Sequence, residues 1–196
     1  MQRSLCLLCT SALAASACGD DAPPVCGVPD DIGDGITVTA EGTTYRFASF
    51  TAGANNDCPA PSPPAGLISV TVFSQQVEPA GTGLITLCLP RPDLLEGDAA
   101  GVEVALDPDN HPAGAADRAH VIDVSAELAN GCRLALDGTG SPDGTAHFTG
   151  LCGGGEDEAG FGLALAGTVA LVERCTGMPD RPLSATLGGS VAVSPE

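Results

Sequence analysis

Apolar residues recur at every second position along most of this chain, and glycine or proline interrupts each run. Ile36, Val38 and Ala40 alternate with threonines, and residues 183–193 alternate apolar side chains with serine and threonine. A period of two sends successive side chains to opposite faces of a strand, so that one face meets a core. Proline cannot donate a ladder hydrogen bond, so strands end where prolines cluster. The pattern predicts an all-β protein with no helix beyond the first residues.

The runs predict about nine or ten strands, at intervals typical of antiparallel folds. The expected fold is an antiparallel two-sheet β-sandwich, with a β-barrel as the alternative. Both faces of residues 160–175 carry apolar side chains, which indicates a central strand. The predicted strands are 36–40, 43–47, 67–75, 84–89, 102–106, 119–128, 132–136, 148–152, 160–175 and 183–193.

The first two strands form a predicted hairpin. If Glu41 and Gly42 make a two-residue loop, Val38 faces Tyr45 and Ile36 faces Phe47. Both apolar sets then lie on one face, as a half-buried hairpin requires.

A second hairpin is predicted around the turn sequence Ser141–Gly144. Folding the chain there places Leu134 opposite Gly150 and Leu136 opposite Phe148, with Cys132 opposite Cys152. Directly opposed residues of an antiparallel pair lie at a separation that suits a disulfide, so we expect Cys132 to bond to Cys152.

The first residues have the form of an export signal. Met1–Arg3 carries a positive charge, and the apolar run 5–15 is too short to span a bilayer as a helix. The chain then reads Ala15-Ser16-Ala17-Cys18, which follows the small-residue pattern of a cleavage site. We therefore expect residues 1–17 to be a signal peptide.

This stretch resembles the lipobox of bacterial lipoproteins, and the resemblance ends at Cys18. The family usually has leucine three positions before the cysteine, where this chain has Ala15. The resemblance implies export, removal of the leader and attachment of a diacylglycerol to the sulfur of Cys18, with palmitate among the acyl groups. Residues 18–35, acidic and rich in proline and glycine, then read as a tether, and residues 36–196 as a single domain.

The cysteine count agrees with such an anchor. Of nine cysteines, Cys6 and Cys9 lie in the leader and Cys18 takes the lipid. The even set that remains in an exported chain predicts three disulfides. Besides Cys132 with Cys152, Cys26 with Cys58 would close the base of the first hairpin, and Cys88 with Cys175 follows by elimination. The absence of C-x-x-C from this set speaks against a zinc or thioredoxin-type site.

The charge of the chain excludes one class of partner. The formal net charge is −18, and loss of Arg3 with the leader takes it to −19. A phosphate polymer would be repelled, so no nucleic acid is expected. Contact with a membrane should come from the lipid anchor and not from a basic patch.

Catalytic and metal-binding patterns are sparse. The chain has no G-x-S-x-G sequence, and its three histidines, His111, His120 and His147, have separate structural explanations. His120 is assigned to the apolar face of its strand with Ile122, Val124 and Ala126, and His147 to the face opposite Phe148. We expect no metal and no cofactor. Calcium is the alternative, held by side chains of two acidic loops: Asp107, Asp109, Asp117, Glu156, Asp157 and Glu158.

The sequence therefore predicts a lipid-anchored structural or binding module, without enzymatic activity, on the periplasmic or outer side of a bacterial cell envelope. The alternative is a metal-dependent binder or hydrolase with its site in loops 107–117 and 153–159. A secreted inhibitor that presents the proline-rich loop 59–64 is a third hypothesis.

Overall fold

Strands make up all regular structure in the part of the chain described by the computed structural model: residues 33, 35–48, 51–55, 58, 67–74, 77–90, 102–109, 117–151 and 161–195. The all-β prediction is confirmed. The eleven strands are β1 (Gly35–Ala40), β2 (Thr43–Ala48), β3 (Thr51–Asn55), β4 (Leu67–Ser74), β5 (Gly83–Pro90), β6 (Glu103–Ala105), β7 (His120–Glu127), β8 (Arg133–Leu136), β9 (Asp143–Leu151), β10 (Phe161–Arg174) and β11 (Arg181–Pro195).

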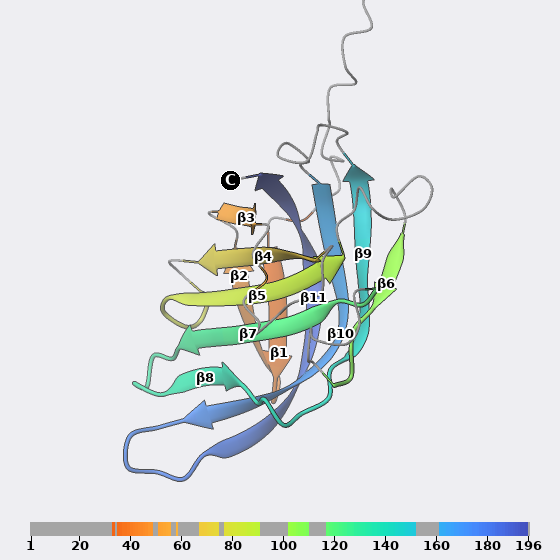
Figure 1. The fold of residues 1–196 in the computed structure, drawn as a ribbon. Helices are drawn as coiled ribbons and strands as arrows, with labels where there is room; N and C mark the ends of the chain where they lie inside the picture. The colour runs from red at the N-terminus through yellow and green to blue at the C-terminus, as the bar shows by residue number, and fades with distance from the viewer. Residues whose placement is uncertain are drawn as a thin grey trace, which may run out of the picture.

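The strands form one strongly curled sheet in the order β2-β1-β11-β3-β4-β5-β7-β8-β10-β9-β6, in which β10 also pairs with β11. Every pairing is antiparallel except the short contact of β11 with β3. In Figure 1, β4, β5, β7 and β8 lie across β1, β11, β10 and β9. We call these sets the front layer and the back layer. Because the sheet curls continuously from one to the other, it resembles a half-barrel, and two separate sheets are not confirmed.

The two longest strands cause the curl. Residues 161–168 of β10 pair with β9, and residues 171–174 pair with β8. Strand β11 likewise pairs with β1 over residues 185–190 and with β3 only at residues 194–195. Each long strand therefore belongs to both layers, as strands do at the corners of crossed sheets.

The predicted first hairpin is confirmed, including its register. Ile36 pairs with Phe47 and Val38 pairs with Tyr45. Glu41 and Gly42 both have positive φ, 48° and 81°, which is the backbone of the two-residue loop that suits strand twist. Local turn chemistry therefore decides this pairing.

The predicted second hairpin is wrong. Strand β8 pairs with β7 on one side and with β10 on the other, so neither edge is left for β9. Strands β8 and β9 run in the same direction, end to end along one edge of β10, and the segment between them does not reverse the chain. Leu136 pairs with Leu171, and Phe148 pairs with Leu163. The fourteen residues of β10 provide partners for both strands.

The core lies between the layers and takes side chains from both. Phe47, Ile85 and Leu134 are fully buried there, and the rings of Phe148 and Phe161 meet edge to face with centroids 5.5 Å apart. Aromatic pairs in this geometry stabilise a core beyond the area that they bury. The alternate residues of the front-layer strands consequently face outward.

Candidate functional site

The outer face of the front layer carries the candidate site. Val72, Ile85, Val124 and Leu134 are fully buried in the core. Because side chains alternate along a strand, their neighbours point to the other face. The outward residues at one end of this layer are Phe73, Leu84, Ser125 and Arg133, one from each strand.

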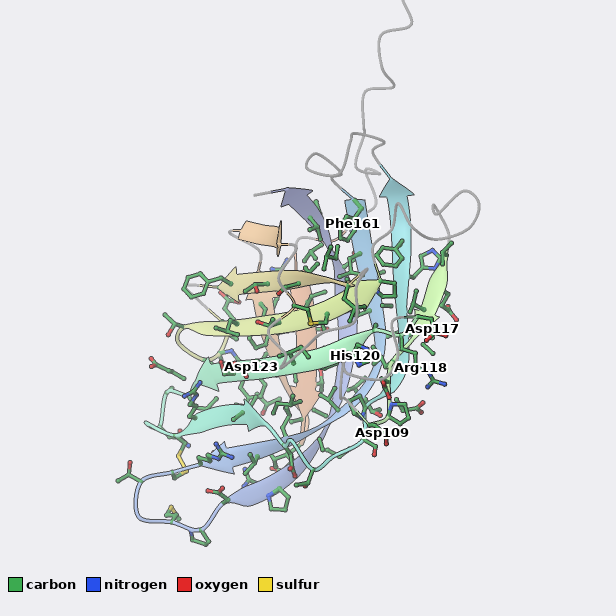
Figure 2. All side chains as sticks on the ribbon, viewed as in Figure 1. Asp109, Asp117, Arg118, His120, Asp123 and Phe161 are labelled. Atoms are coloured by element: carbon green, nitrogen blue, oxygen red, sulfur yellow. A yellow bond between two sulfur atoms is a disulfide. The ribbon has the colours of Figure 1, made fainter. Side chains whose placement is uncertain are left out.

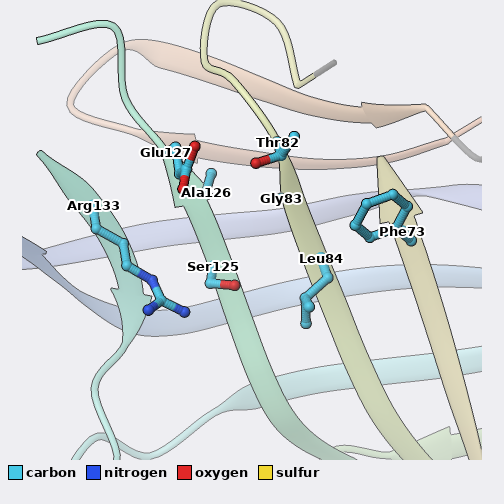
Figure 3. Close-up of a pocket in the computed structure, with 8 residues that line it drawn as sticks. All are labelled: Phe73, Thr82, Gly83, Leu84, Ser125, Ala126, Glu127 and Arg133. Atoms are coloured by element: carbon cyan, nitrogen blue, oxygen red, sulfur yellow. The ribbon is translucent and has the colours of Figure 1, made fainter. Parts of the chain in front are cut away.

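A shallow groove runs across these four strands (Figure 3). Its volume is about 200 Å³. Phe73 is 38% exposed, whereas most large apolar side chains of the described residues are buried. We name this feature the front groove; its lining residues are Phe73, Thr82, Gly83, Leu84, Ser125, Ala126, Glu127 and Arg133.

The two ends of the front groove differ in chemistry. Phe73 and Leu84 form an apolar end, and the guanidinium of Arg133 forms a cationic end. Figure 3 shows this guanidinium turned toward Ser125 and away from Glu127, although Glu127 pairs with Arg133 in the register of β7 and β8. The side chain of Arg133 makes no hydrogen bond or ion pair with any residue in the described ranges.

Asp123 is an acidic group that interacts electrostatically with Arg133 at this end. It lies two residues before Ser125 on β7 and is partly buried. Burial raises the pKa of the Asp123 carboxyl, while Arg133 and a backbone hydrogen bond at Val124 act in the opposite direction. Asp123 thus partly compensates the charge of Arg133, but Arg133 forms no ion pair within the described ranges.

A disulfide covers the other end of the same face. Cys88 of β5 bonds to Cys58, with Cα atoms 5.6 Å apart. The two cysteines and Leu67 form a small buried cluster, and Ile122 packs against it. The outer face of the front layer is therefore closed at the disulfide and open at the front groove.

Next to this cluster, the structure brings together two residues of the sequence-predicted site. The Nδ1 atom of His120 lies 3.4 Å from the Oδ2 atom of Asp107, and both side chains are buried. The backbone N–H of Asp107 donates to the carbonyl of Ala119, and Oδ1 of Asp107 accepts from the N–H of Asp109. A buried carboxylate that accepts such bonds fixes the loop that precedes β7.

The predicted face of His120 is wrong because β7 contains a bulge. Thr86 pairs with Asp123 but Leu87 pairs with Val121, so Ile122 is an extra residue in the ladder. A bulge reverses the alternation of side chains. Val121 and Val124 therefore both enter the core, whereas Ile122 packs on the outer cluster. His120, next to Val121, lies on the same outer side.

Comparisons with known proteins provide no relative for this arrangement. No family model, no curated protein and no solved structure matches the chain.

Among the residues that the structure describes, the other predicted metal ligands do not gather around His120. Asp109, Asp117 and Arg118 lie at the surface beside the start of β7 (Figure 2). His147 is on β9, opposite in face to the buried Phe148, as predicted. His111, Glu156, Asp157 and Glu158 lie outside the described residues.

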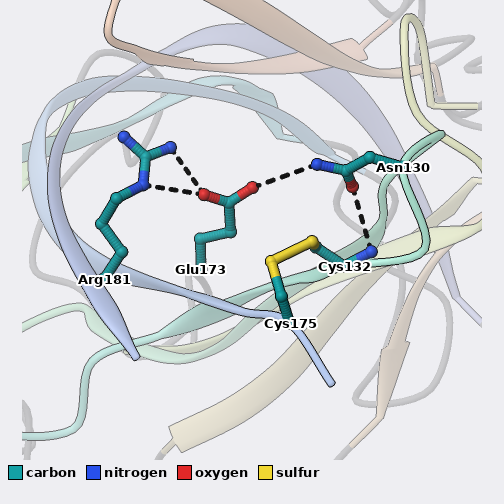
Figure 4. The surroundings of a disulfide bond; sticks show 5 residues. All are labelled: Asn130, Cys132, Glu173, Cys175 and Arg181. Carbon is teal, nitrogen blue, oxygen red and sulfur yellow. Dashed lines mark hydrogen bonds and ion pairs between the residues drawn. A yellow bond between two sulfur atoms is a disulfide. The ribbon is translucent and has the colours of Figure 1, made fainter. Parts of the chain in front are cut away.

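Among the described residues, one group of three potential ligands has its atoms within 4.8 Å of one another: Cys132, Glu173 and Cys175. These two cysteines form a disulfide with Cα atoms 4.3 Å apart. Figure 4 shows Glu173 between Arg181 and Asn130, and the Asn130 side chain accepts from the N–H of Cys132 at 3.0 Å. The sulfurs are occupied in this oxidised state, and the network stabilises the corner of the sheet.

All three predicted disulfide pairings are wrong. Cys132 bonds to Cys175 rather than Cys152, and Cys58 and Cys88 bond to each other rather than to Cys26 and Cys175. Cys132 and Cys175 are directly opposed residues of an antiparallel pair, because they extend the register of β8 and β10 by one position, and this separation suits a disulfide. The strand that faces β8 at this position is β10 and not β9. Cys26, Cys152 and Cys18, the predicted site of lipid attachment, lie outside the described residues.

Sequence reasoning missed the front groove. Alternation does place Arg133 and Phe73 on outward positions, but it does not say which strands lie side by side. Strand β4 and strand β8 are separated in the sheet by β5 and β7. Only this order brings Phe73, which is exposed, and Arg133, which has no acidic partner among the described residues, to one face.

Proposed function

We propose that this protein is an exported, lipid-anchored binding module of a bacterial cell envelope, without enzymatic activity, held on the periplasmic or outer side by a lipid on Cys18. The observation that carries the proposal is the pair of disulfides, Cys58–Cys88 and Cys132–Cys175, on distant parts of one sheet. Disulfides persist in oxidising, extracytoplasmic compartments. The crossed layers serve as the two sheets of a sandwich, whose inner faces form the core and whose front outer face remains for a ligand.

The anchor is supported by the lipobox-like Ala15-Ser16-Ala17-Cys18 and by the cysteine count. Four cysteines pair in the described structure, which leaves Cys26 and Cys152 after the leader together with Cys18. If Cys18 carries a lipid, the remaining two can bond to each other and no thiol is left over. In the described part of the chain, no helix has the length and apolar character that crossing a membrane requires.

Metabolic labelling with a palmitate analogue tests the anchor. We expect the wild-type chain to incorporate the label and the Cys18→Ser variant to incorporate none. Fractionation should place the wild type in the membrane pellet and the variant in the soluble fraction. A wild-type chain that is exported and processed but takes up no label would contradict the proposal.

A second function is favoured by the buried contact of Asp107 with His120. A carboxylate that orients an imidazole is a common support for metal ligation or hydrolysis, which is the alternative that the sequence predicts for loops 107–117 and 153–159. Elemental analysis, together with melting in calcium and in chelator, tests it. A bound metal with a rise in Tm would favour this function, whereas no metal and an unchanged Tm would count against the metal-dependent form.

A further inference from the structure

The charge and shape of the front groove point to its ligand. This inference rests on the proposed binding role and concerns the ligand class only. We propose that the front groove binds a small amphipathic anion, with the anionic head against Arg133 and Ser125 and the apolar body against Phe73 and Leu84.

The position of Arg133 provides the first argument. The protein has few cations, and the described residues include several that already have acidic partners: Arg174 contacts Asp180, and Arg181 contacts Glu173 and Glu41. Arg133 has no such partner among the described residues and faces a concave surface. A planar guanidinium in that position suits a carboxylate or sulfonate, which it binds through two parallel hydrogen bonds.

The apolar end provides the second argument. Exposed phenylalanine costs free energy in water unless a ligand covers it, and Phe73 forms one wall of the groove beside Leu84. An alkyl chain or a small ring laid on these two side chains would bury apolar area from both partners. An inorganic anion would leave that end empty, which is why the ligand is amphipathic.

The dimensions limit the ligand to a small one. Neighbouring strands lie about 4.8 Å apart, so β4 and β8 are separated by roughly 14 Å, part of which the Arg133 side chain spans. The volume of about 200 Å³ is below that of ordinary ligand pockets. Octanoate is a suitable probe, and for an open site of this size we expect a Kd of about 1 mM.

The negative charge of Asp123 should weaken the binding of an anion in the front groove. Its carboxylate opposes the binding of any anion at Arg133, because the two residues interact electrostatically. Replacing it by asparagine keeps the shape and removes the charge. The Asp123→Asn variant should therefore bind the anion about two- to five-fold more tightly.

The test is a titration of the full mature chain with octanoate, in which calorimetry and NMR measure binding. The chain is purified as the Cys18→Ser variant so that no lipid is attached. Octanoate should bind saturably, and octyltrimethylammonium, which has the same chain with a cationic head, should not. Arg133→Gln and Phe73→Ala, both substitutions of exposed side chains, should each weaken octanoate binding about five-fold or more. Arg118→Gln is the matched control at an exposed arginine outside the groove and should bind as the parent does.

Three results would overturn the inference: no saturable binding of octanoate, equal binding of the cationic amphiphile, or an unchanged Kd in Arg133→Gln. Octanesulfonate, which stays ionised in acid, should bind like octanoate, and added salt should weaken both. None of these outcomes depends on the lipid, so failure here leaves the anchor intact. Failure of palmitate labelling equally leaves the groove to be judged by this titration.

Discussion

Cys132 and Cys175 face each other across β8 and β10, one register position beyond the pair Arg133–Arg174, and their Cα atoms are 4.3 Å apart. The bond joins the front layer to the back layer at the corner where β10 passes between them. The chain from Cys132 to Cys175 includes all of β8, β9 and β10, so this disulfide closes a long loop.

Peptide mapping under non-reducing conditions tests the pairing. We expect Cys58 with Cys88 and Cys132 with Cys175, and the even count of six predicts that Cys26 and Cys152 bond to each other. A fragment that joins Cys132 to Cys152 would contradict the register of β8 and β10.

Removing the corner disulfide should destabilise the protein. The two cysteines are 43 positions apart in the sequence, and a disulfide that closes a loop of this length stabilises the folded state by about 2–4 kcal/mol because it restricts the unfolded chain. The Cys132→Ser, Cys175→Ser double variant should unfold at lower denaturant with its fold retained. The single variant Cys132→Ser provides the control for a free thiol, and equal stability of parent and double variant would contradict the prediction.

Gly144 should not tolerate any side chain. It has a φ of 133°, and a Cβ atom there would overlap the carbonyl of Ala166 and the Cα of Gly167, with which Gly144 pairs. We expect Gly144→Ala to lower the free energy of unfolding by about 3 kcal/mol, since neither backbone can withdraw without breaking the ladder. Gly138→Ala, where a Cβ meets nothing within 4 Å, is the matched control and should change stability by no more than about 0.5 kcal/mol.

Asp123 should make the protein less stable at neutral pH than its asparagine variant. Burial raises the pKa of this carboxyl in the folded state, so its ionised form disfavours folding. Asp123→Asn should add about 0.5 kcal/mol at pH 7, a small value because the group is half exposed and screened. The gain should disappear below about pH 4, where aspartate is protonated in both states. A gain that persists at pH 3 would show that charge is not the cause.

The interaction of Arg181 with Glu173 should stabilise the protein at neutral pH and lose this effect in acid, which is the opposite of the effect of Asp123. Its Nε and Nη2 atoms donate to Oε2 of Glu173 at 2.8 and 2.6 Å, and these bonds are the main reason that the pKa of Glu173 is lowered. Stability from a lowered carboxyl pKa is present above the unfolded-state value and is lost as the pH falls through the folded-state value. Arg181→Gln should therefore lower Tm at pH 7 and lose less stability than the parent on acidification.

Arg174→Gln is the control for that experiment. Its contact with Asp180 is 3.3 Å long, and both side chains are more than half exposed, so little stability should depend on it. If Arg181→Gln and the parent melt with parallel pH profiles, Glu173 does not derive its stabilising effect from Arg181.

The sequence alone determined most of the strands and the first hairpin, but it did not predict β3. The alternation of Ile36 and Val38 with threonine, and the turn at Glu41 and Gly42, specify a register through contacts between near neighbours in the chain. The alternation of apolar and polar residues along the chain also places Arg133 outward, because side-chain direction in a strand depends only on position. These properties are local, so a period of two and a turn suffice to predict them.

Only the tertiary structure decided which strands are neighbours, and with them the disulfides and the front groove. Pairing of β8 with β10 rather than β9 depends on the length of β10 and on β7 occupying the other edge of β8, which no local pattern reports. The bulge at Ile122 likewise redirects His120 through a register shift against β5. Ladder hydrogen bonds are alike for every strand, so the choice of partner follows from packing the whole curled sheet around one core.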